Sequence, residues 1–444
     1  MKRLEGPLIE MSDRHSFKAF IRVLACQDRG KNAGLANVSI RSFLSYRLPQ
    51  SAHHDPFVGF REMKRTLFAG KKKQPIYETT NFIFDSSIKT RDLRVDYLGK
   101  IGFTEMEFIA RNELVFLWNN ISPAAKIAAI LKGVQWATQC LWSKNRVNKA
   151  LFFRSLIEFI CFVKIIDSKK KKIVFDFNQF EVDSNLFYVA VSDLFGENLV
   201  YRKFPSPGPL QLHNSILLAD VICYNTPYHL EEIKELKETI RCEKIERVPM
   251  EQFFLYADLY QGANSTNDQY ALAYYSHASW LRRLSDHADD GLNILEYENS
   301  LLQNLDIYLR ANPDKKLVIF THPRERKIEV LTDIITYYKN FFQNSDQVSF
   351  CKEKTASSSE FRTAKIGIGV YSTILFERLA CGCPTLIMTP STAFPMKSSS
   401  LSNIVVNDGN LQEKLSESLK ITRQEFFQKN QIEDYIEPYL NQGL

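Results

Sequence analysis

The sequence lacks any C-x-x-C pair, although eight cysteines are spread over its 444 residues. Zinc sites and disulfide frameworks usually depend on cysteines at close, repeated spacings. The one close pair, Cys381-Gly382-Cys383, is too short for the usual spacing of metal ligands. The sequence therefore predicts neither a metal site nor a disulfide scaffold, and we expect a reducing compartment.

Long apolar runs are also missing. The N-terminal stretch MKRLEGPLIEMSDRHSF is interrupted by Glu5, Glu10 and Asp13, so it lacks the apolar core of a signal peptide. The most apolar region, Ile130–Ile166, contains charged side chains throughout. That pattern excludes an ordinary spanning helix of about 20 apolar residues. We expect a cytoplasmic protein, with peripheral attachment to the inner membrane left open.

No large excess of one charge sign is present. The net charge of +6 and the pI near 8.7 suit anionic partners such as nucleotides, phosphates or a lipid surface. The basic residues are dispersed and match no known nucleic-acid-binding motif, so we expect no nucleic acid partner. The cluster Lys71-Lys72-Lys73 keeps nucleic-acid binding as an alternative. The run Lys169–Lys172 fits either a solvated turn or a contact with anionic lipid.

The chain divides into three regions of different pattern. Residues 1–172 are irregular and rich in Phe and basic residues, with predicted helices at Ala124–Trp142 and Lys149–Ile166. Residues 173–290 alternate strand and helix, which is typical of an α/β unit with a mostly parallel sheet. Residues 291–444 resume this alternation after a helical bridge predicted roughly over Asp268–Arg310.

The predicted strands are short apolar runs bounded by turn residues or helical patterns. They are Ile173–Phe177, Leu199–Phe204, Ala219–Asn225, Lys244–Pro249, Lys316–Phe320, Gln347–Cys351, Lys365–Val370 and Pro384–Met388. The predicted helices are Asp183–Gly196, the segment after Thr226-Pro227, Ile328–Gln343, Ser358–Ala364, Ser372–Gly382 and the tail from Leu411. Two such lobes predict a cleft between them. Ligands of such sheets lie beyond the carboxyl ends of the strands.

A histidine stands at one of these strand ends. His322 follows the predicted strand Lys316–Phe320 after a single residue, and Pro323 stiffens the turn. Histidine titrates near neutrality, so it can donate a proton or, when charged, neutralise a phosphate. The alternative is a histidine that merely caps the carbonyl groups of its strand.

A second candidate is the strand-to-helix turn at Ser372-Thr373. Small hydroxyl residues at a helix N-terminus can cap the helix, and the free backbone N–H groups there can bind a phosphate. Glu377 lies one helical turn after Thr373, so it is a candidate acceptor for a ribose or sugar hydroxyl. Plain N-capping is the alternative for both hydroxyls.

The third candidate is Asp289-Asp290-Gly291. Either carboxylate could act as a general base, and adjacent like charges tend to raise one of the two pKa values. Capping of the following helix is the alternative.

Taken together, these three short motifs resemble those of bacterial GT-B sialyltransferases of the lipooligosaccharide and capsule type. The resemblance covers roughly Asp289–Pro384, in the order acidic pair with glycine, His-Pro and Ser/Thr, and the context STILFERLACGCP adds to it. It implies an α/β, GT-B-like fold with two Rossmann-like lobes facing a cleft. The mostly helical N-terminal region, residues 1–172, is an extra part to which the resemblance does not extend.

The resemblance also implies a chemistry. The enzyme would move sialic acid from CMP-sialic acid to a glycan or glycolipid hydroxyl, with inversion and without a metal or another cofactor. Asp289 or Asp290 would be the base, and His322 would protonate or stabilise the departing phosphate. Ser372 and Thr373 would hold that phosphate, and Pro323 of the His-Pro motif would belong to the same donor-binding residues. Residues 1–172 would dock an acceptor or an anionic membrane surface, which Trp136 and Trp142 suit.

Three alternatives stay open at this point. The first is a transferase of the same architecture with another donor, such as CMP-Kdo, in capsule or lipopolysaccharide synthesis. The second is a nucleic-acid-binding protein. The third is a non-catalytic protein that binds nucleotides or glycans on a GT-B body.

Overall fold

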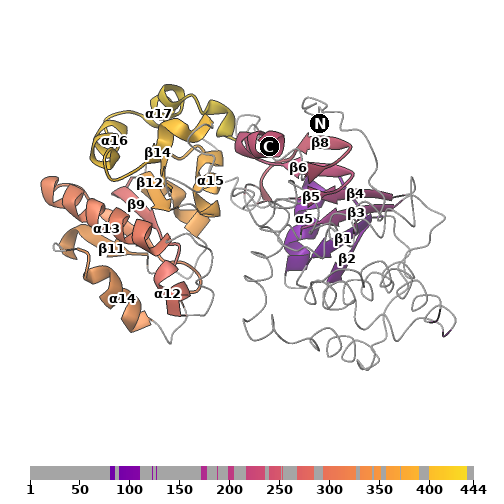
Figure 1. The fold of residues 1–444 in the computed structure, drawn as a ribbon, viewed down its shortest axis with the longest axis horizontal. Coiled ribbons are helices and arrows are strands. Elements are labelled where there is room, and N and C mark those ends of the chain that lie inside the picture. Colours follow the sequence, from indigo (N-terminus) through magenta and orange to yellow (C-terminus); the bar gives the residue numbers. More distant parts are fainter. Residues whose placement is uncertain are drawn as a thin grey trace, which may run out of the picture. The chain divides into compact units, whose positions relative to one another are not determined.

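The computed structural model describes about half of the chain. The described residues are 81–85, 90–110, 123, 127, 172–177, 188, 199–204, 217–235, 240–251, 253, 268–284, 294–326, 331–342, 345–351, 357–370, 372–389 and 400–437. The chain divides into two compact units (Figure 1). Unit 1 comprises Met1–Ser206, Leu210–Tyr224 and Ile233–Val248, and unit 2 comprises Pro207–Pro209, Asn225–Glu232 and Pro249–Leu444.

The first unit is built on a six-stranded sheet in which every neighbouring pair is parallel, in the order β2-β1-β3-β4-β6-β8. Its strands are β1 (Asn81–Asp85), β2 (Met106–Ala110), β3 (Lys172–Asp176), β4 (Leu199–Lys203), β6 (Val221–Tyr224) and β8 (Lys244–Arg247). The unit also contains α5 (Arg91–Lys100) and a two-stranded sheet of β5 (Leu217–Leu218) and β7 (Ile240–Arg241). The four strands predicted after residue 172 are confirmed to within a few residues.

Strands β1 and β2 precede residue 172, in the region that the sequence set apart as irregular and mostly helical. Both join the first sheet, because β1 pairs with β3 along its length and with β2 on its other side. Five-residue runs such as NFIFD become recognisable as strands only when a partner strand is present. The predicted helices Ala124–Trp142 and Lys149–Ile166 lie outside the described residues, apart from Ile127.

The second unit is built on another six-stranded parallel sheet, in the order β11-β10-β9-β12-β13-β14. Its strands are β9 (Tyr270–Tyr275), β10 (Leu317–Phe320), β11 (Val348–Phe350), β12 (Ala364–Val370), β13 (Thr385–Met388) and β14 (Val405–Val406). Its α-helices are α12 (Ser279–Leu284), α13 (Ile294–Ala311), α14 (Leu331–Lys339), α15 (Thr373–Ala380), α16 (Leu411–Ser418) and α17 (Arg423–Asn430). A further helix, α10 (Pro227–Glu235), has residues in both units.

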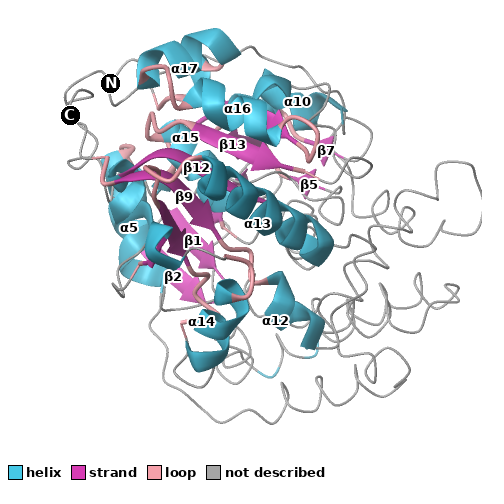
Figure 2. Cartoon of the chain, turned by 90° about the vertical axis from the view of Figure 1, so that its left-hand side faces the viewer, coloured by secondary structure: helices cyan, strands magenta, loops and turns pink. Residues whose placement is uncertain are grey.

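Helices cover both faces of this sheet. Helix α13 packs on β12 from one side, with α16 beside it, and Figure 2 looks onto that layer. Helix α15 packs on β12 and β13 and lies on the other side of the sheet in Figure 1. The strands between the layers are therefore almost wholly apolar, and Leu272, Ile319 and Ile368 are completely buried. The chain thus has an α/β, GT-B-like fold with two Rossmann-like units.

The prediction of a helical bridge over Asp268–Arg310 is wrong for its first part. Tyr270–Tyr275 forms β9, the strand between β10 and β12 in the second sheet. A continuous apolar run such as YALAYY shows no alternation, because its strand is covered on both faces, and periodicity alone cannot distinguish it from a buried helix. The later part of the bridge is helical, since α13 begins at Ile294.

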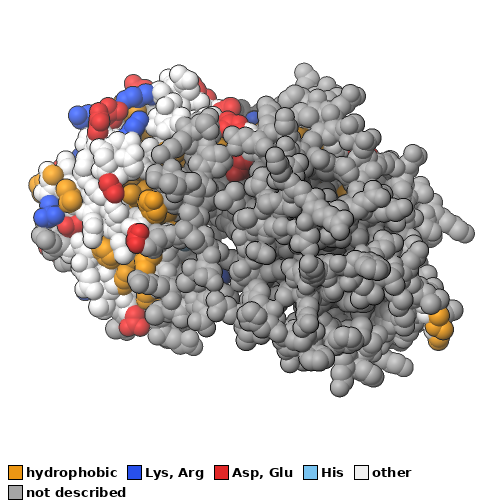
Figure 3. Space-filling view, in the orientation of Figure 1, with side chains coloured by type: hydrophobic (Ala, Val, Ile, Leu, Met, Phe, Trp, Pro, Cys, Tyr) orange, Lys and Arg blue, Asp and Glu red, His pale blue; other side chains and the backbone are white. Residues whose placement is uncertain are grey.

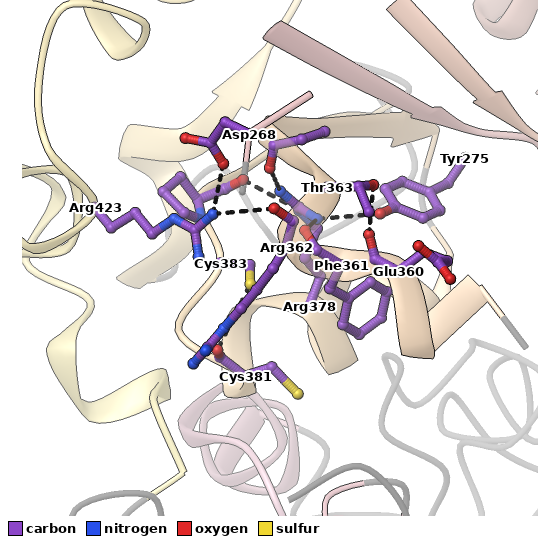
Figure 4. A network of polar contacts seen from close by, with 12 residues as sticks. Asp268, Tyr275, Glu360, Phe361, Arg362, Thr363, Arg378, Cys381, Cys383 and Arg423 are labelled. Atoms are coloured by element: carbon purple, nitrogen blue, oxygen red, sulfur yellow. Dashed lines mark hydrogen bonds and ion pairs between the residues drawn. The ribbon is translucent and has the colours of Figure 1, made fainter. Parts of the chain in front are cut away.

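A buried arginine links several elements of the second unit by hydrogen bonds (Figure 4). Arg378 of α15 donates hydrogen bonds to the carbonyl oxygens of Ala364 at 2.6 Å and of Phe361, and to the hydroxyl of Tyr275 at 3.1 Å. Gly367 on β12 leaves the space for this side chain, since a Cβ there would collide with the guanidinium. The arginine therefore connects a helix, two strands and the segment before β12.

None of the described helices is long and apolar enough to cross a membrane. On the face of the second unit that Figure 3 shows, acidic and basic side chains are interspersed and do not gather into a patch of one sign. The described residues of this face therefore show no basic stripe of the kind that a nucleic-acid-binding surface requires.

Candidate functional site

The candidate site lies where the strand order of the second sheet reverses. From β9 the chain builds outward through β10 to β11, and it then returns to the other side of β9 with β12 and β13. In doubly wound sheets, ligands bind at the carboxyl ends of the strands on either side of such a reversal. The residues that follow β9, β10 and β12 are therefore the ones to examine.

His322 stands at the exit of β10, as the sequence predicted. It opens a tight turn in which the backbone N–H of Glu325 donates to the carbonyl oxygen of His322 over 2.8 Å. Pro323 occupies the second position of this turn, where its fixed φ is favourable and no N–H is needed. Pro323 is exposed, and its contribution visible here is the shape of the turn.

A backbone N–H group contacts the imidazole of His322. Its Nδ1 lies 3.1 Å from the backbone nitrogen of Arg324, whose N–H can only donate. Nδ1 is therefore the accepting nitrogen in this contact, which fits an imidazole that carries a hydrogen on Nε2. An Nε2–H group is a hydrogen-bond donor, which is what an anionic phosphate oxygen requires.

The buried side chain of Glu325 stabilises this turn. Its side chain is completely buried, and Oε2 accepts the backbone N–H of His322 over 2.6 Å. Oε1 accepts the indole N–H of Trp280 at 2.6 Å and the hydroxyl of Tyr338 at 3.0 Å. Burial raises the pKa of Glu325, while the hydrogen bonds from Trp280, His322, Ser276 and Tyr338 act in the opposite direction.

A second histidine follows β9, and sequence reasoning missed it. His277 comes two residues after Tyr275, and its Nδ1 lies 3.1 Å from the hydroxyl oxygen of Ser279. Next to it, Ala278 adopts a φ of +57°, which is uncommon for a residue with a side chain. The backbone N–H of Ala278 donates to Ser276 Oγ over 2.9 Å and helps to hold this conformation.

Glu298 of α13 supports this exit as Glu325 supports the other. The carboxylate is buried, and Oε1 accepts the backbone N–H of His277 over 2.7 Å. The hydroxyl of Tyr274 donates to the same oxygen over 2.6 Å, and the backbone N–H of Ser279 donates to Oε2 over 2.9 Å. Burial and the nearby carboxylate of Glu298 raise the pKa of Tyr274 well above its usual range, so it remains a donor.

Ser372 and Thr373 stand at the exit of β12. Ser372 is the N-cap of α15 with an extended backbone, yet its side chain makes no capping hydrogen bond. Among the described contacts, plain N-capping therefore does not account for this hydroxyl. Thr373 is exposed, whereas Glu377 is buried one turn further along. The predicted contact of Glu377 with a sugar hydroxyl stays a prediction.

The acidic pair Asp289 and Asp290 lies outside the described residues, so the base remains a prediction from the sequence. The described residues contain no group of three or more His, Cys, Asp and Glu side chains placed to hold a metal ion. The structure places His322, His277 and Ser372 at the same edge of the sheet, and two buried carboxylates accept the backbone N–H groups of the histidines. Such a set can bind an anion.

The signal for the missed histidine was present in the sequence. YALAYY-Ser276-His277 repeats the pattern LVIF-Thr321-His322, in which an apolar strand is followed by a hydroxyl residue and a histidine. It was overlooked because the strand before it was assigned to a helix. Glu298 and Glu325 carried no comparable signal, since an isolated glutamate within a helical pattern or after a proline is ordinary surface sequence.

Comparison with known proteins gives no family. Neither a protein-family model nor a curated protein matches the sequence. Solved structures do superpose on it, and 80 chains do so significantly. One is an α,α-trehalose 6-phosphate synthase from Burkholderia multivorans, with a TM-score of 0.44 and 11% identity over 80% of this chain and 92% of that one.

Two further structures superpose over similar lengths. A UDP-GlcNAc 2-epimerase from Methanocaldococcus jannaschii, in complex with UDP-GlcNAc and UDP, has a TM-score of 0.42 and 13% identity over 77% of this chain and 93% of its own. MurG from Acinetobacter baumannii has a TM-score of 0.41 and 11% identity over 82% of this chain and 97% of its own.

Proposed function

We propose that this chain is a GT-B-type glycosyltransferase that binds the phosphate of a nucleotide-sugar donor at the carboxyl edge of its second sheet. The observation that carries the proposal is the placement of His322 and Ser372 at the exits of two strands that flank β9. Both are hydrogen-bond donors, and both lie where parallel sheets of this kind bind nucleotides.

The donor that we propose is CMP-sialic acid. This choice rests on the order of the three motifs, from Asp289-Asp290-Gly291 through His322-Pro323 to Ser372-Thr373. A phosphate-binding site does not by itself identify the sugar or the nucleobase of the donor. CMP-Kdo and other nucleotide-sugars are therefore the alternatives that the experiment must separate.

In the proposed reaction, an acceptor hydroxyl oxygen attacks the anomeric carbon while one of Asp289 and Asp290 takes its proton. The bond between the anomeric carbon and the phosphate oxygen breaks, and the electron pair leaves with CMP. Negative charge therefore grows on the phosphate, where prearranged donors stabilise the transition state more than the ground state. His322 Nε2–H and Ser372 Oγ–H would supply these donors.

The contact at Nδ1 of His322 favours one of its two predicted roles. A neutral imidazole that donates from Nε2 stabilises a leaving phosphate by hydrogen bonding, whereas full proton transfer would require the imidazolium form. The contact between Arg324 N–H and Nδ1 opposes that form, because it would place two N–H groups against each other. We therefore assign His322 the role of hydrogen-bond donor.

The test is donor hydrolysis. The purified protein is incubated with CMP-sialic acid, CMP-Kdo and a panel of UDP- and GDP-sugars, and the released nucleotide is measured with and without a glycan acceptor mixture. We expect release of CMP, selectively from CMP-sialic acid. Release of UDP or GDP would show that the donor is another nucleotide-sugar, and the proposed transferase activity would stand. Absence of both donor turnover and nucleotide binding would overturn the proposal. Binding of CMP without donor turnover in the presence of any acceptor would indicate a binding protein.

A further inference from the structure

The exits of β9 and β10 share one local design. Tyr275 and Phe320 are opposite each other in the parallel register, and each is followed by a hydroxyl residue and then a histidine. The backbone N–H of Ser276 donates to the carbonyl oxygen of Phe320 over 3.0 Å, which continues the pairing beyond β9. Neighbouring strands lie about 4.8 Å apart, so the backbones of His277 and His322 leave the sheet side by side.

The same kind of support holds both histidines. The backbone N–H of His322 donates to Glu325 over 2.6 Å, and the backbone N–H of His277 donates to Glu298 over 2.7 Å. Both carboxylates are buried, although one belongs to the turn after β10 and the other to α13. A buried carboxylate costs free energy unless it is well hydrogen-bonded. The repetition therefore indicates that the position of each histidine matters.

The exit of β9 is also held in an uncommon backbone conformation. Ala278 has a positive φ, and it is fixed from both sides by Ala278 N–H donating to Ser276 and Ser279 N–H donating to Glu298. Such conformations persist only where the surrounding structure determines them, and they cluster at functional sites. The backbone N–H groups of His277, Ala278 and Ser279 thus each donate a hydrogen bond to a side-chain oxygen.

We propose that His277 is a second contact to the donor phosphate, acting beside His322 on the same anion. Nδ1 of His277 lies 3.1 Å from the hydroxyl oxygen of Ser279, and the proposed contact with the phosphate is made by Nε2. In this arrangement the imidazoles of His277 and His322, which follow the adjacent strands β9 and β10, contact one phosphate. Ser372, which follows β12 on the other side of β9, would be the third contact. This inference rests on the proposed function, because it adds a residue to the same donor site.

The test combines nucleotide binding with a direct view of the two rings. Affinity for CMP, UMP, UDP and GDP is measured by calorimetry for the wild-type chain and for His277→Ala, His277→Gln and His322→Ala. Ring ¹⁵N resonances of histidine are followed by NMR during the titration and are assigned from the His277→Gln and His322→Gln spectra. Asp333→Ala, at an exposed position of α14 in the same unit, serves as the surface control.

We expect one nucleotide to shift the ring resonances of both histidines. His277→Ala should lower its affinity about 10- to 100-fold, as the loss of one hydrogen bond to a charged group predicts. His277→Gln should lose less, because its amide nitrogen occupies the position of Nε2. Circular dichroism shows whether the variants are folded.

The outcomes separate this inference from the proposed function. If a nucleotide binds and shifts only His322, and His277→Ala binds it as tightly as the wild type, His277 is no phosphate contact but the donor site stands. If His277→Ala loses affinity while the ring of His277 does not shift, the residue acts only on the shape of the loop and the inference is wrong. If none of the four nucleotides binds, the proposed function falls and this inference with it.

Discussion

The indole N–H of Trp280 and the backbone N–H of His322 donate to the two oxygens of one buried carboxylate, that of Glu325. Trp280 lies in α12, directly after the exit of β9, whereas His322 lies at the exit of β10. Glu325 therefore joins the two loops that carry the candidate phosphate contacts. Relative movement of these loops would break at least one short hydrogen bond in the interior.

Replacing this carboxylate should destabilise the unit. Glu325→Gln keeps the size of the side chain, but its single carbonyl oxygen cannot accept from Trp280, His322 and Tyr338 together. We expect a loss of about 1–3 kcal/mol in the free energy of unfolding, the usual cost of a buried donor left without an acceptor. Urea denaturation measures it. A variant as stable as the wild type would show that the carboxylate does not hold the loops.

The same variant should show a defined pH dependence. Burial raises the pKa of Glu325 in the folded state above its unfolded value, so ionisation opposes folding. The stability of the wild type should therefore fall, relative to that of Glu325→Gln, as the pH rises from about 4.5 through the folded pKa. The destabilisation caused by Glu325→Gln should therefore shrink as the pH rises above about 4.5. Growth of this difference with pH would contradict the raised pKa.

The assigned role of His322 predicts unequal effects of two substitutions. His322→Ala removes the hydrogen-bond donor at the leaving phosphate, and we expect the rate of donor cleavage to fall about 10²- to 10³-fold. His322→Gln places an amide nitrogen near the position of Nε2, so it should retain more activity than His322→Ala. Single-turnover release of the nucleotide measures both. Equal losses would favour proton transfer by an imidazolium, since an amide cannot replace it.

Gly369 should tolerate no side chain. A Cβ at this position would lie 2.8 Å from the carbonyl oxygen of Tyr275, a backbone atom of the neighbouring strand β9. Gly369→Ala should therefore destabilise the protein by about 1–3 kcal/mol through overpacking. Gly409→Ala is the matched control, because Gly409 is exposed and its Cβ would meet only the side-chain oxygen of Asn407, at 3.3 Å. We expect a change within about 0.5 kcal/mol there.

Arg378 should not be replaceable by lysine. Its guanidinium donates to carbonyl oxygens in three directions and to Tyr275, and a lysine ammonium cannot reproduce that planar fork. Arg378→Lys should cost about 1.5–3 kcal/mol or more, the value of one hydrogen bond from a charged group. The control is Arg310→Lys, since Arg310 is exposed and forms a single ion pair, with Asp306 one turn before it on α13. A similar small effect for both substitutions would contradict a structural role for Arg378.

Several features of this protein follow from the sequence alone. Short apolar runs separated by helical patterns are enough to predict parallel α/β units, because such strands are covered on both faces. His322-Pro323 and Ser372 could be placed at strand exits for the same reason, since the end of an apolar run marks the carboxyl end of a strand. Their motif order suggested a donor class, which stays a proposal.

Other features were decided only by the tertiary structure. The central strand β9 could not be distinguished from a helix by its composition, and β1 and β2 became strands only through their pairing with β3 and with each other. His277 joined His322 because β9 and β10, which are separated in the sequence by two helices, fold as neighbouring strands. The carboxylates of Glu298 and Glu325 acquire their role through burial next to backbone N–H groups. Sequence pattern reports which residues prefer to be buried, whereas strand order and register decide which of them meet.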